Sequence, residues 1–209
     1  MFFSLDGIDG TGKSTQLALC ETWLRGLGYD VVTCRDPGST PLGESIRAIL
    51  LESRDTPISR TAEMLLYMAA RAQLVAQVIR PALEAGKMVL SDRYLLANVV
   101  YQGHAGGLDV EELWRIGRTA TGGLEPNLTI VLDMSPQAAQ ARLARPLDRM
   151  ELQGDEFRQR LRAGFLAESG RRPEQIMVVD AARAVEVVQA EIQQAINERL
   201  VPPPQGRQS

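Results

Sequence analysis

The sequence predicts an α/β domain in which helices cover both faces of a five-stranded parallel sheet. Two observations indicate this fold class. Short apolar runs of strand length alternate along the chain with longer segments in which apolar residues recur every three or four positions. A glycine-rich segment also lies directly between the first apolar run and the first helical segment, a place where parallel sheets bind ligands at the carboxyl ends of their strands.

The expected strands are apolar runs that read as buried on both faces. They are Phe2–Asp6, Tyr29–Cys34, Lys87–Ser91, Leu128–Asp133 and Ile176–Asp180.

Local signals place the helices between these strands. Gly28 and Gly86 follow two of the periodic segments, as glycine does at helix ends. Asp109 with Glu112 has the form of a capping box, and Ser135 before Pro136 supplies an N-cap and a first-turn proline. The expected helices span about Lys13–Leu27, Ser59–Ala85 and 183–200, and others begin at Pro41, Asp109 and Ser135.

Length and composition favour one soluble globular domain. A chain of 209 residues with 44% hydrophobic and 23% charged residues predicts a single domain over residues 1–200, followed by a Pro-rich tail, 201–209, expected to be disordered. The net charge of −3 argues against broad nucleic-acid binding. The most apolar long stretch, residues 62–79, contains Glu63 and Arg71, so it predicts a buried or half-buried helix and no membrane span.

The cysteines indicate a reducing compartment. Cys20 and Cys34 lack metal-ligand spacing, and no secretory signal is visible at the N-terminus. We expect both thiols to be reduced and the protein to be cytoplasmic.

The glycine-rich segment has the pattern of a phosphate-binding loop. It reads Gly7-Ile8-Asp9-Gly10-Thr11-Gly12-Lys13-Ser14, which is G-x-x-x-x-G-K-[ST], with Thr15 next. A chance match in a chain of this length is about 1%, and the placement between strand and helix lowers that further. The pattern predicts a P-loop NTPase fold in which backbone amides hold ATP phosphates, Lys13 reaches the β- and γ-phosphates, and the Ser14 hydroxyl binds Mg²⁺.

The class of nucleotide-binding protein can be narrowed. No Asn-Lys-x-Asp guanine motif is present, which argues against a GTPase switch protein. Asp92-Arg93-Tyr94 follows an expected strand, so Asp92 can hold Mg²⁺ opposite Ser14 and Arg93 can clamp a phosphate. A surface ion pair at a strand end is the alternative. The combination favours a kinase for a small molecule.

Six ordered segments resemble the thymidylate kinase family across nearly the whole chain. They are Gly7–Thr15, Arg35-Asp36-Pro37-Gly38, Gly43-Glu44-x-Ile46-Arg47, Asp92-Arg93-Tyr94 continuing to Tyr101-Gln102-Gly103, Pro126–Thr129 running into Leu132-Asp133, and Asp148-Arg149.

The resemblance implies roles for residues on the acceptor side. Asp9 is expected to contact the deoxyribose 3′-hydroxyl and to organise the reacting phosphates. Arg93 is expected to bind the acceptor phosphate, with Arg47 close to it. Tyr67 is expected to stack on thymine, and Arg71 to donate a hydrogen bond to its O4.

The resemblance further implies that Asn98 and Gln102 read the pyrimidine edge and that Tyr101 crowds a ribose 2′-hydroxyl. Helical spacing is consistent with these groupings, since residues four apart share a face. Without the family resemblance, a tyrosine such as Tyr67 is more often a core aromatic. Asn98 and Gln102 could then equally be polar residues on the surface of a helix. A charged Arg71 in an apolar helix needs a buried partner or a ligand.

Two departures from the family pattern affect the same pocket. The chain has Asp36-Pro37-Gly38-Ser39 where the family usually has Glu-Pro-Gly-Gly. Asp36 and Pro37 are still expected in the substrate site, with the shorter carboxylate reaching the loop or magnesium through water. Tyr67 stands where Phe is more usual.

An arginine-rich segment is expected to form a lid over about residues 142–155. The phosphate loop has no basic residue at its variable positions, so the chain is similar to bacterial members that supply a transition-state arginine from the lid. Arg145 and Arg149 are the candidates for catalysis and Arg142 for ATP binding, whereas Arg158 to Arg162 read as a solvated helix face. By position, the loop 181–183 is the place for adenine.

The sequence and its resemblance together imply transfer of the γ-phosphoryl group of ATP to dTMP, with Mg²⁺, in dTTP synthesis. The resemblance also implies a homodimer through helices that include residues 62–79. Two alternatives stay open: another nucleoside monophosphate or deoxynucleoside kinase on the same scaffold, and a nucleotide-binding regulator that has lost catalysis.

Overall fold

Five parallel strands form one sheet in the order β2-β3-β1-β4-β5. The computed structural model describes residues 1–51, 57–143 and 153–200. The predicted parallel sheet is confirmed, and each strand lies within two residues of its expected bounds. The strands are β1 (Phe2–Asp6), β2 (Val31–Arg35), β3 (Met88–Asp92), β4 (Leu128–Asp133) and β5 (Ile176–Asp180).

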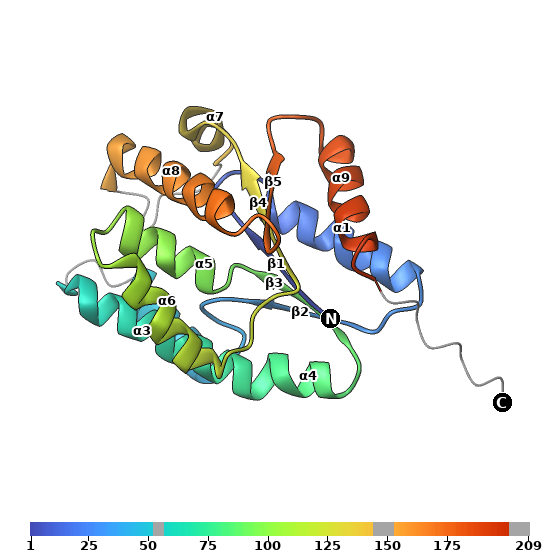
Figure 1. The fold of residues 1–209 in the computed structure, drawn as a ribbon, viewed down its shortest axis with the longest axis horizontal. Coiled ribbons are helices and arrows are strands. Elements are labelled where there is room, and N and C mark those ends of the chain that lie inside the picture. Colours follow the sequence, from blue (N-terminus) through green and yellow to red (C-terminus); the bar gives the residue numbers. More distant parts are fainter. Residues whose placement is uncertain (52–56, 144–152, 201–209) are drawn as a thin grey trace.

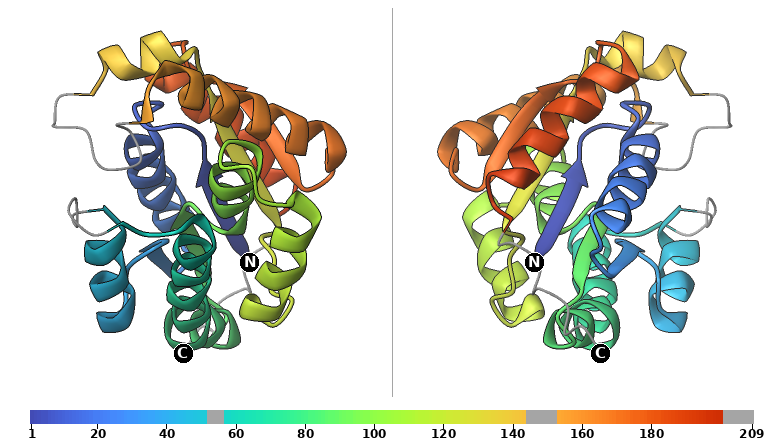
Figure 2. Two further views of the ribbon diagram at one scale, coloured as in Figure 1. Left: turned by 90° about the vertical axis from the view of Figure 1, so that its left-hand side faces the viewer. Right: turned by 90° about the vertical axis from the view of Figure 1, so that its right-hand side faces the viewer.

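Helices cover both faces of this sheet (Figure 1). On one face, α1 (Lys13–Gly26) packs on β1, β2 and β3, and α9 (Val185–Asn197) packs on α1 and β5. On the other face, α4 (Arg80–Glu84) contacts β3 and α8 (Asp155–Arg171) contacts β5. Figure 2 shows the same layers from the two sides.

The other α-helices of the described residues have their main contacts with helices and not with the sheet. They are α2 (Pro41–Leu51), α3 (Arg60–Leu74), α5 (Leu95–Asn98), α6 (Val110–Thr121) and α7 (Pro136–Ala141). The pair α2 and α3 pack on each other, and α3 also contacts α5 and α6. Because α3 and α5 each present an apolar face with a few polar residues, they can build a pocket whose polar groups are buried.

The long helix expected over Ser59–Ala85 is present but changes its winding. Ser59 caps α3 by accepting a hydrogen bond from the Ala62 amide, and the chain then passes through a π-helical segment, η1 (Val75–Ile79), into α4. Pro81, which has no N–H group, sits in the first turn of α4, where a regular α-helical ladder would lose a hydrogen bond.

A similar wide turn follows α5. The π-helical segment η2 (Val99–His104) carries Tyr101 and Gln102 and packs on α8. Such segments occur where helices position functional side chains.

The core consists of aliphatic and aromatic side chains between the sheet and its helices. The five side chains of β1 are all buried, and two of them are polar. Ser4 is satisfied by a 2.9 Å hydrogen bond to Thr129 of β4, whereas Asp6 ends the strand immediately before the glycine-rich loop. Within the described residues, no helix combines the length and apolar character needed to cross a bilayer.

Candidate active site

The loop between β1 and α1 is held open by glycines in the left-handed region. Gly7, Gly10 and Gly12 have φ values of 131°, 89° and 93°. A Cβ atom on Gly10 would lie 2.0 Å from the carbonyl oxygen of Ala139, and one on Gly7 would lie 2.5 Å from that of Leu132. The loop therefore tolerates only glycine at these two positions, because the backbone of α7 and the end of β4 press against it.

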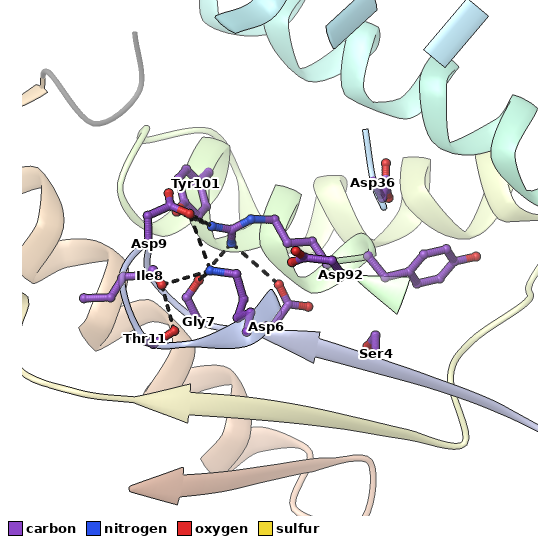
Figure 3. A network of polar contacts seen from close by, with 12 residues as sticks. Ser4, Asp6, Gly7, Ile8, Asp9, Thr11, Asp36, Asp92 and Tyr101 are labelled. Carbon is purple, nitrogen blue, oxygen red and sulfur yellow. Dashed lines mark hydrogen bonds and ion pairs between the residues drawn. The ribbon is translucent and has the colours of Figure 1, made fainter. Parts of the chain in front are cut away.

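Lys13 lies buried beneath this loop. Its ammonium donates to the carbonyl oxygens of Gly7 at 3.2 Å and Ile8 at 3.0 Å, and the Thr11 hydroxyl donates to the same Ile8 oxygen at 2.9 Å (Figure 3). Burial lowers the pKa of Lys13, and the charge of Arg93 lowers it further, while Asp9 acts in the opposite direction. A bound phosphate would add to the negative charge of Asp9, whose Oδ1 lies 3.4 Å from the ammonium.

Arg93 crosses the mouth of the loop from the end of β3. Its guanidinium donates through Nη1 to the Gly7 carbonyl at 2.8 Å and through Nη2 to Asp9 Oδ1 at 2.7 Å. Nη2 also donates to the Tyr101 hydroxyl at 3.1 Å, and that hydroxyl donates to Asp9 Oδ2 at 3.3 Å. Burial acts against the charged form of Arg93, but the neighbouring carboxylates, Asp9 above all, hold its pKa well above the ordinary value.

The backbone of Arg93 is itself unusual. Its φ of 67° places a non-glycine residue in the left-handed region, where β3 turns toward α5. Arg93 N donates to the Leu5 carbonyl at 2.9 Å, which fixes this turn against β1. Strain of this kind persists where the surrounding structure over-determines it, and here it aims the guanidinium at the loop.

Two oxygen donors suited to magnesium meet beside the loop. The Ser14 hydroxyl at the start of α1 donates to Asp92 Oδ2 at 3.4 Å. Hydroxyl, carboxylate and phosphate oxygens are the ligands that Mg²⁺ prefers. In the part of the chain that the structure describes, no cluster of three or more His, Cys, Asp or Glu residues could hold a metal. The two side chains therefore fit an ion that also takes ligands from a bound phosphate.

Two cavities open on either side of Arg93. The larger, about 640 Å³, is lined by the loop, by Ser14 and Asp92, and by residues at the end of β5 and the start of α9. The smaller, about 90 Å³, lies among α2, α3 and α5. Both cavities are lined by Asp9, Asp36, Arg47 and Arg93, so they meet at these four residues.

The structure brings most of the sequence-predicted residues to these cavities, whereas Gly7 lines neither of them. The larger is lined by Gly10, Thr11, Gly12, Lys13, Ser14, Thr15, Asp92, Arg142, Ala181 and Arg183, and the smaller by Pro37, Tyr67, Arg71, Asn98, Tyr101 and Gln102. Arg142 donates to the Ala181 carbonyl at 3.1 Å, and Arg47 donates to the Pro37 carbonyl at 3.0 Å. Arg145 and Arg149, with most of the expected lid, lie outside the described residues.

Arg71 is a deeply buried charged residue of the smaller cavity. It is 1% exposed, and its Nε donates to Asp36 Oδ2 at 2.5 Å. This differs from the expectation that Asp36 reaches the loop or magnesium through water. The shorter carboxylate of Asp36 turns instead toward the buried guanidinium, which needs a counter-charge. Burial raises the pKa of Asp36, and Arg71 acts against that rise.

A line of hydrogen bonds continues from Arg71 across the cavity. Arg71 Nη1 donates to Asn98 Oδ1 at 3.0 Å, Asn98 Nδ2 donates to Gln102 Oε1 at 2.6 Å, and Gln102 Nε2 donates to Glu63 Oε1 at 2.8 Å. Glu63 was not among the predicted site residues. Its spacing could have shown it, because residues 63, 67 and 71 fall on one helical face.

Asp6 is a second buried carboxylate that the sequence reading passed over. Both of its oxygens are buried without a hydrogen-bond donor among the described residues, and the nearest cation is Arg93 Nη1 at 3.9 Å. Burial raises the pKa of Asp6 to about 7, although Arg93 and Lys13 lower it. Its position directly before Gly7 was the available signal.

Known proteins of one family are similar to this chain over nearly its whole length. The family model described as thymidylate kinase matches residues 5–192. Thymidylate kinase of Symbiobacterium thermophilum is 45% identical over 96% of this chain and 94% of its own length. That of Leifsonia xyli is 48% identical over 96% of both chains. The crystal structure of thymidylate kinase from Ehrlichia chaffeensis superimposes with a TM-score of 0.77 at 27% identity, covering 94% of this chain and 98% of that one. The chain therefore belongs to the thymidylate kinase family, and with it to the nucleoside monophosphate kinases.

Proposed function

We propose that this chain transfers the γ-phosphoryl group of ATP to dTMP, giving dTDP and ADP in the synthesis of dTTP. One observation carries the proposal: a phosphate-loop cavity and a smaller, partly apolar cavity meet at Asp9 and Arg93. A reaction between two nucleotides needs two such sites that join where the phosphates react.

On the donor side, the proposed ligands of the phosphates are the loop amides and Lys13. Ser14 and Asp92 would hold Mg²⁺, which when bound neutralises charge on the β- and γ-phosphates. Adenine would lie toward Ala181 and Arg183, beside Arg142.

On the acceptor side, Arg93 and Arg47 would hold the phosphate of dTMP. Tyr67 would stack on thymine within the smaller cavity, and Asp36 would keep Arg71 in place beside the base. The Tyr101 hydroxyl, fixed by Asp9 and Arg93, would occupy the space of a ribose 2′-hydroxyl.

The chemistry requires positioning more than proton transfer. A phosphate monoester has a second pKa of about 6, so its attacking oxygen is already an anion near neutral pH. Lys13 and Arg93 both contact Oδ1 of Asp9, where the two nucleotides would meet. They would offset the repulsion between two polyanions and the charge that develops in transfer.

The arginines of the expected lid complete the proposal. Arg145 or Arg149 would stabilise the transition state, because the phosphate loop supplies no basic side chain at its variable positions. Replacing both with alanine should lower turnover by orders of magnitude while ATP still binds. Arg160→Ala, which changes an exposed arginine on α8, is the control. Normal turnover in the double variant would remove the lid arginines from the mechanism.

The decisive experiment compares acceptors. ADP release would be measured with dTMP, dUMP, CMP and UMP, and Lys13→Ala would serve as a control against contaminating kinases. The proposal expects fast transfer to dTMP and weak transfer to the ribonucleotides. Preference for CMP or UMP would favour another monophosphate kinase, and no transfer to any acceptor would favour a silent regulator.

Assembly and location belong to the same proposal. We propose a homodimer through α2 and α3, which pack together and expose Leu42, Ile49 and Leu65. Light scattering of the wild type and of Leu65→Glu would test it, and a monomeric wild type would contradict it. We also propose a cytoplasmic protein, because Cys20 and Cys34 are buried free thiols. Cell fractionation would test that location.

A further inference from the structure

Glu63 contacts the candidate base site without lining it. The side chain lies on α3, is 6% exposed, and accepts a hydrogen bond from Gln102. It is absent from the lining of the smaller cavity, whereas Arg71, Asn98 and Gln102 all line it. The hydrogen bond from Gln102 therefore connects Glu63 to the lining of the cavity.

The hydrogen-bond line from Arg71 to Glu63 has a fixed direction. A guanidinium can only donate, and a carboxylate can only accept. Between them lie two amides, Asn98 and Gln102, each able to present either its oxygen or its NH₂ group to a neighbour. Only one orientation of both amides satisfies all three bonds, and it is the one observed.

We infer that Glu63 is a positioning residue that sets which face of the Asn98 amide meets the base, and so makes the site select a 4-keto pyrimidine over cytosine. The inference rests on the proposed function and deepens it. In the fixed orientation, an Arg71 N–H donor stands beside the Asn98 oxygen acceptor. Thymine offers the complement, an O4 acceptor beside an N3–H donor.

Cytosine offers the reverse pair, an amino donor beside an N3 acceptor. To receive it, the Asn98 amide would have to turn over. Turning Asn98 alone breaks its bonds to Arg71 and Gln102. Turning Asn98 and Gln102 together keeps the bond between them but sets an amide oxygen against Glu63 and an NH₂ group against Arg71. Either way, two of the three bonds become repulsive contacts.

Glu63→Gln removes one of these two barriers. A glutamine at 63 can turn with the other two amides and donate to Gln102, so reversal then breaks only the bond at Arg71. The conservative variant Glu63→Asp keeps the direction, because a carboxylate at 63 again only accepts from Gln102. It also keeps the number of charges unchanged. Glu84→Gln, on an exposed position of α4, is the matched control.

The test measures binding of dTMP, dUMP and dCMP by calorimetry or competition to the full-length chain, without ATP. Glu63→Gln should lower the ratio of dissociation constants, dCMP over dTMP, by at least about fivefold. Glu63→Asp and the Glu84 control should keep the wild-type ratio. The dUMP-to-dTMP ratio should stay constant in all four proteins, because uracil and thymine present the same edge. A merely structural defect would weaken all three ligands alike.

An unchanged dCMP-to-dTMP ratio in folded Glu63→Gln would overturn the inference, as would a wild type that binds dCMP as well as dTMP. If Glu63→Gln does not fold, Glu63→Asp decides, since a loss of dTMP preference in a variant that keeps the carboxylate contradicts the inference. The proposed function fails separately, through absence of dTMP phosphorylation by the wild type.

Discussion

The buried ion pair between Arg71 and Asp36 gives the sharpest test of how this site is built. The two side chains are 1% and 0% exposed, and their atoms approach to 2.5 Å. Removing one partner of such a pair leaves an uncompensated buried charge, at a cost of about 3–5 kcal/mol. Arg71 keeps hydrogen bonds to Asn98 and to the Tyr94 carbonyl, so we expect Asp36→Ala to fall near the lower end of that range.

The expected effect is a clear change in thermal unfolding. For a chain of 150–250 residues, 1 kcal/mol moves Tm by about 2–4 °C, so Asp36→Ala should lower Tm by roughly 6–12 °C. The assay is unfolding of the ligand-free protein followed by circular dichroism. Glu156→Ala, which breaks an exposed pair with Arg160, should shift Tm by no more than about 2 °C.

A second variant separates charge from cavity formation. Asp36→Ala/Arg71→Met leaves the same cavity at position 36 but removes the buried guanidinium of Arg71. Its Tm should therefore be higher than that of Asp36→Ala. If Asp36→Ala melts within about 2 °C of the wild type, or the double variant melts no higher than the single one, the electrostatic reasoning is wrong.

Three further predictions concern the phosphate loop and Asp6, the residue directly before it. Asp9→Ala should abolish phosphoryl transfer in a coupled assay while circular dichroism shows a folded chain, since this carboxylate organises Arg93 and Lys13; near-normal activity would remove Asp9 from the site. Gly10→Ala should lose ATP affinity and stability, because its Cβ would meet a backbone oxygen of α7 at 2.0 Å with φ at 89°; unchanged ATP binding and melting would contradict the tight fit. Asp6 has a folded-state pKa of about 7, above its ordinary 3.8, so its contribution to the unfolding free energy is complete below about pH 4 and is lost as pH rises through 7. Asp6→Asn should therefore show a flatter decline of stability between pH 4 and 8 than the wild type, by up to about 1.36 kcal/mol per pH unit; parallel profiles in urea titrations would refute this.

Local patterns in the sequence determined the framework of the site. The strands, the phosphate loop and the caps at Asp109 and Ser135 depend on residues close in sequence, so they could be predicted directly. The helical spacing of Tyr67 and Arg71 likewise placed both on one face. No helix bounds were predicted for Leu95–His104, because the turns of its π-helical part are wider than 3.6 residues. None were predicted for α8, because its apolar periodicity is weak.

Only the tertiary structure decided which polar groups pair inside the site. Arg71 meets Asp36 from 35 positions away and Asn98 from 27, and Gln102 meets Glu63 from 39. The sequence showed that a buried Arg71 needs a partner, but several carboxylates could have served. Strand order and the packing of α3 on α5 and η2 select among them. Burial then makes the selected bonds necessary. A donor or charge that is buried without a partner has lost its hydrogen bonds to water and destabilises the fold.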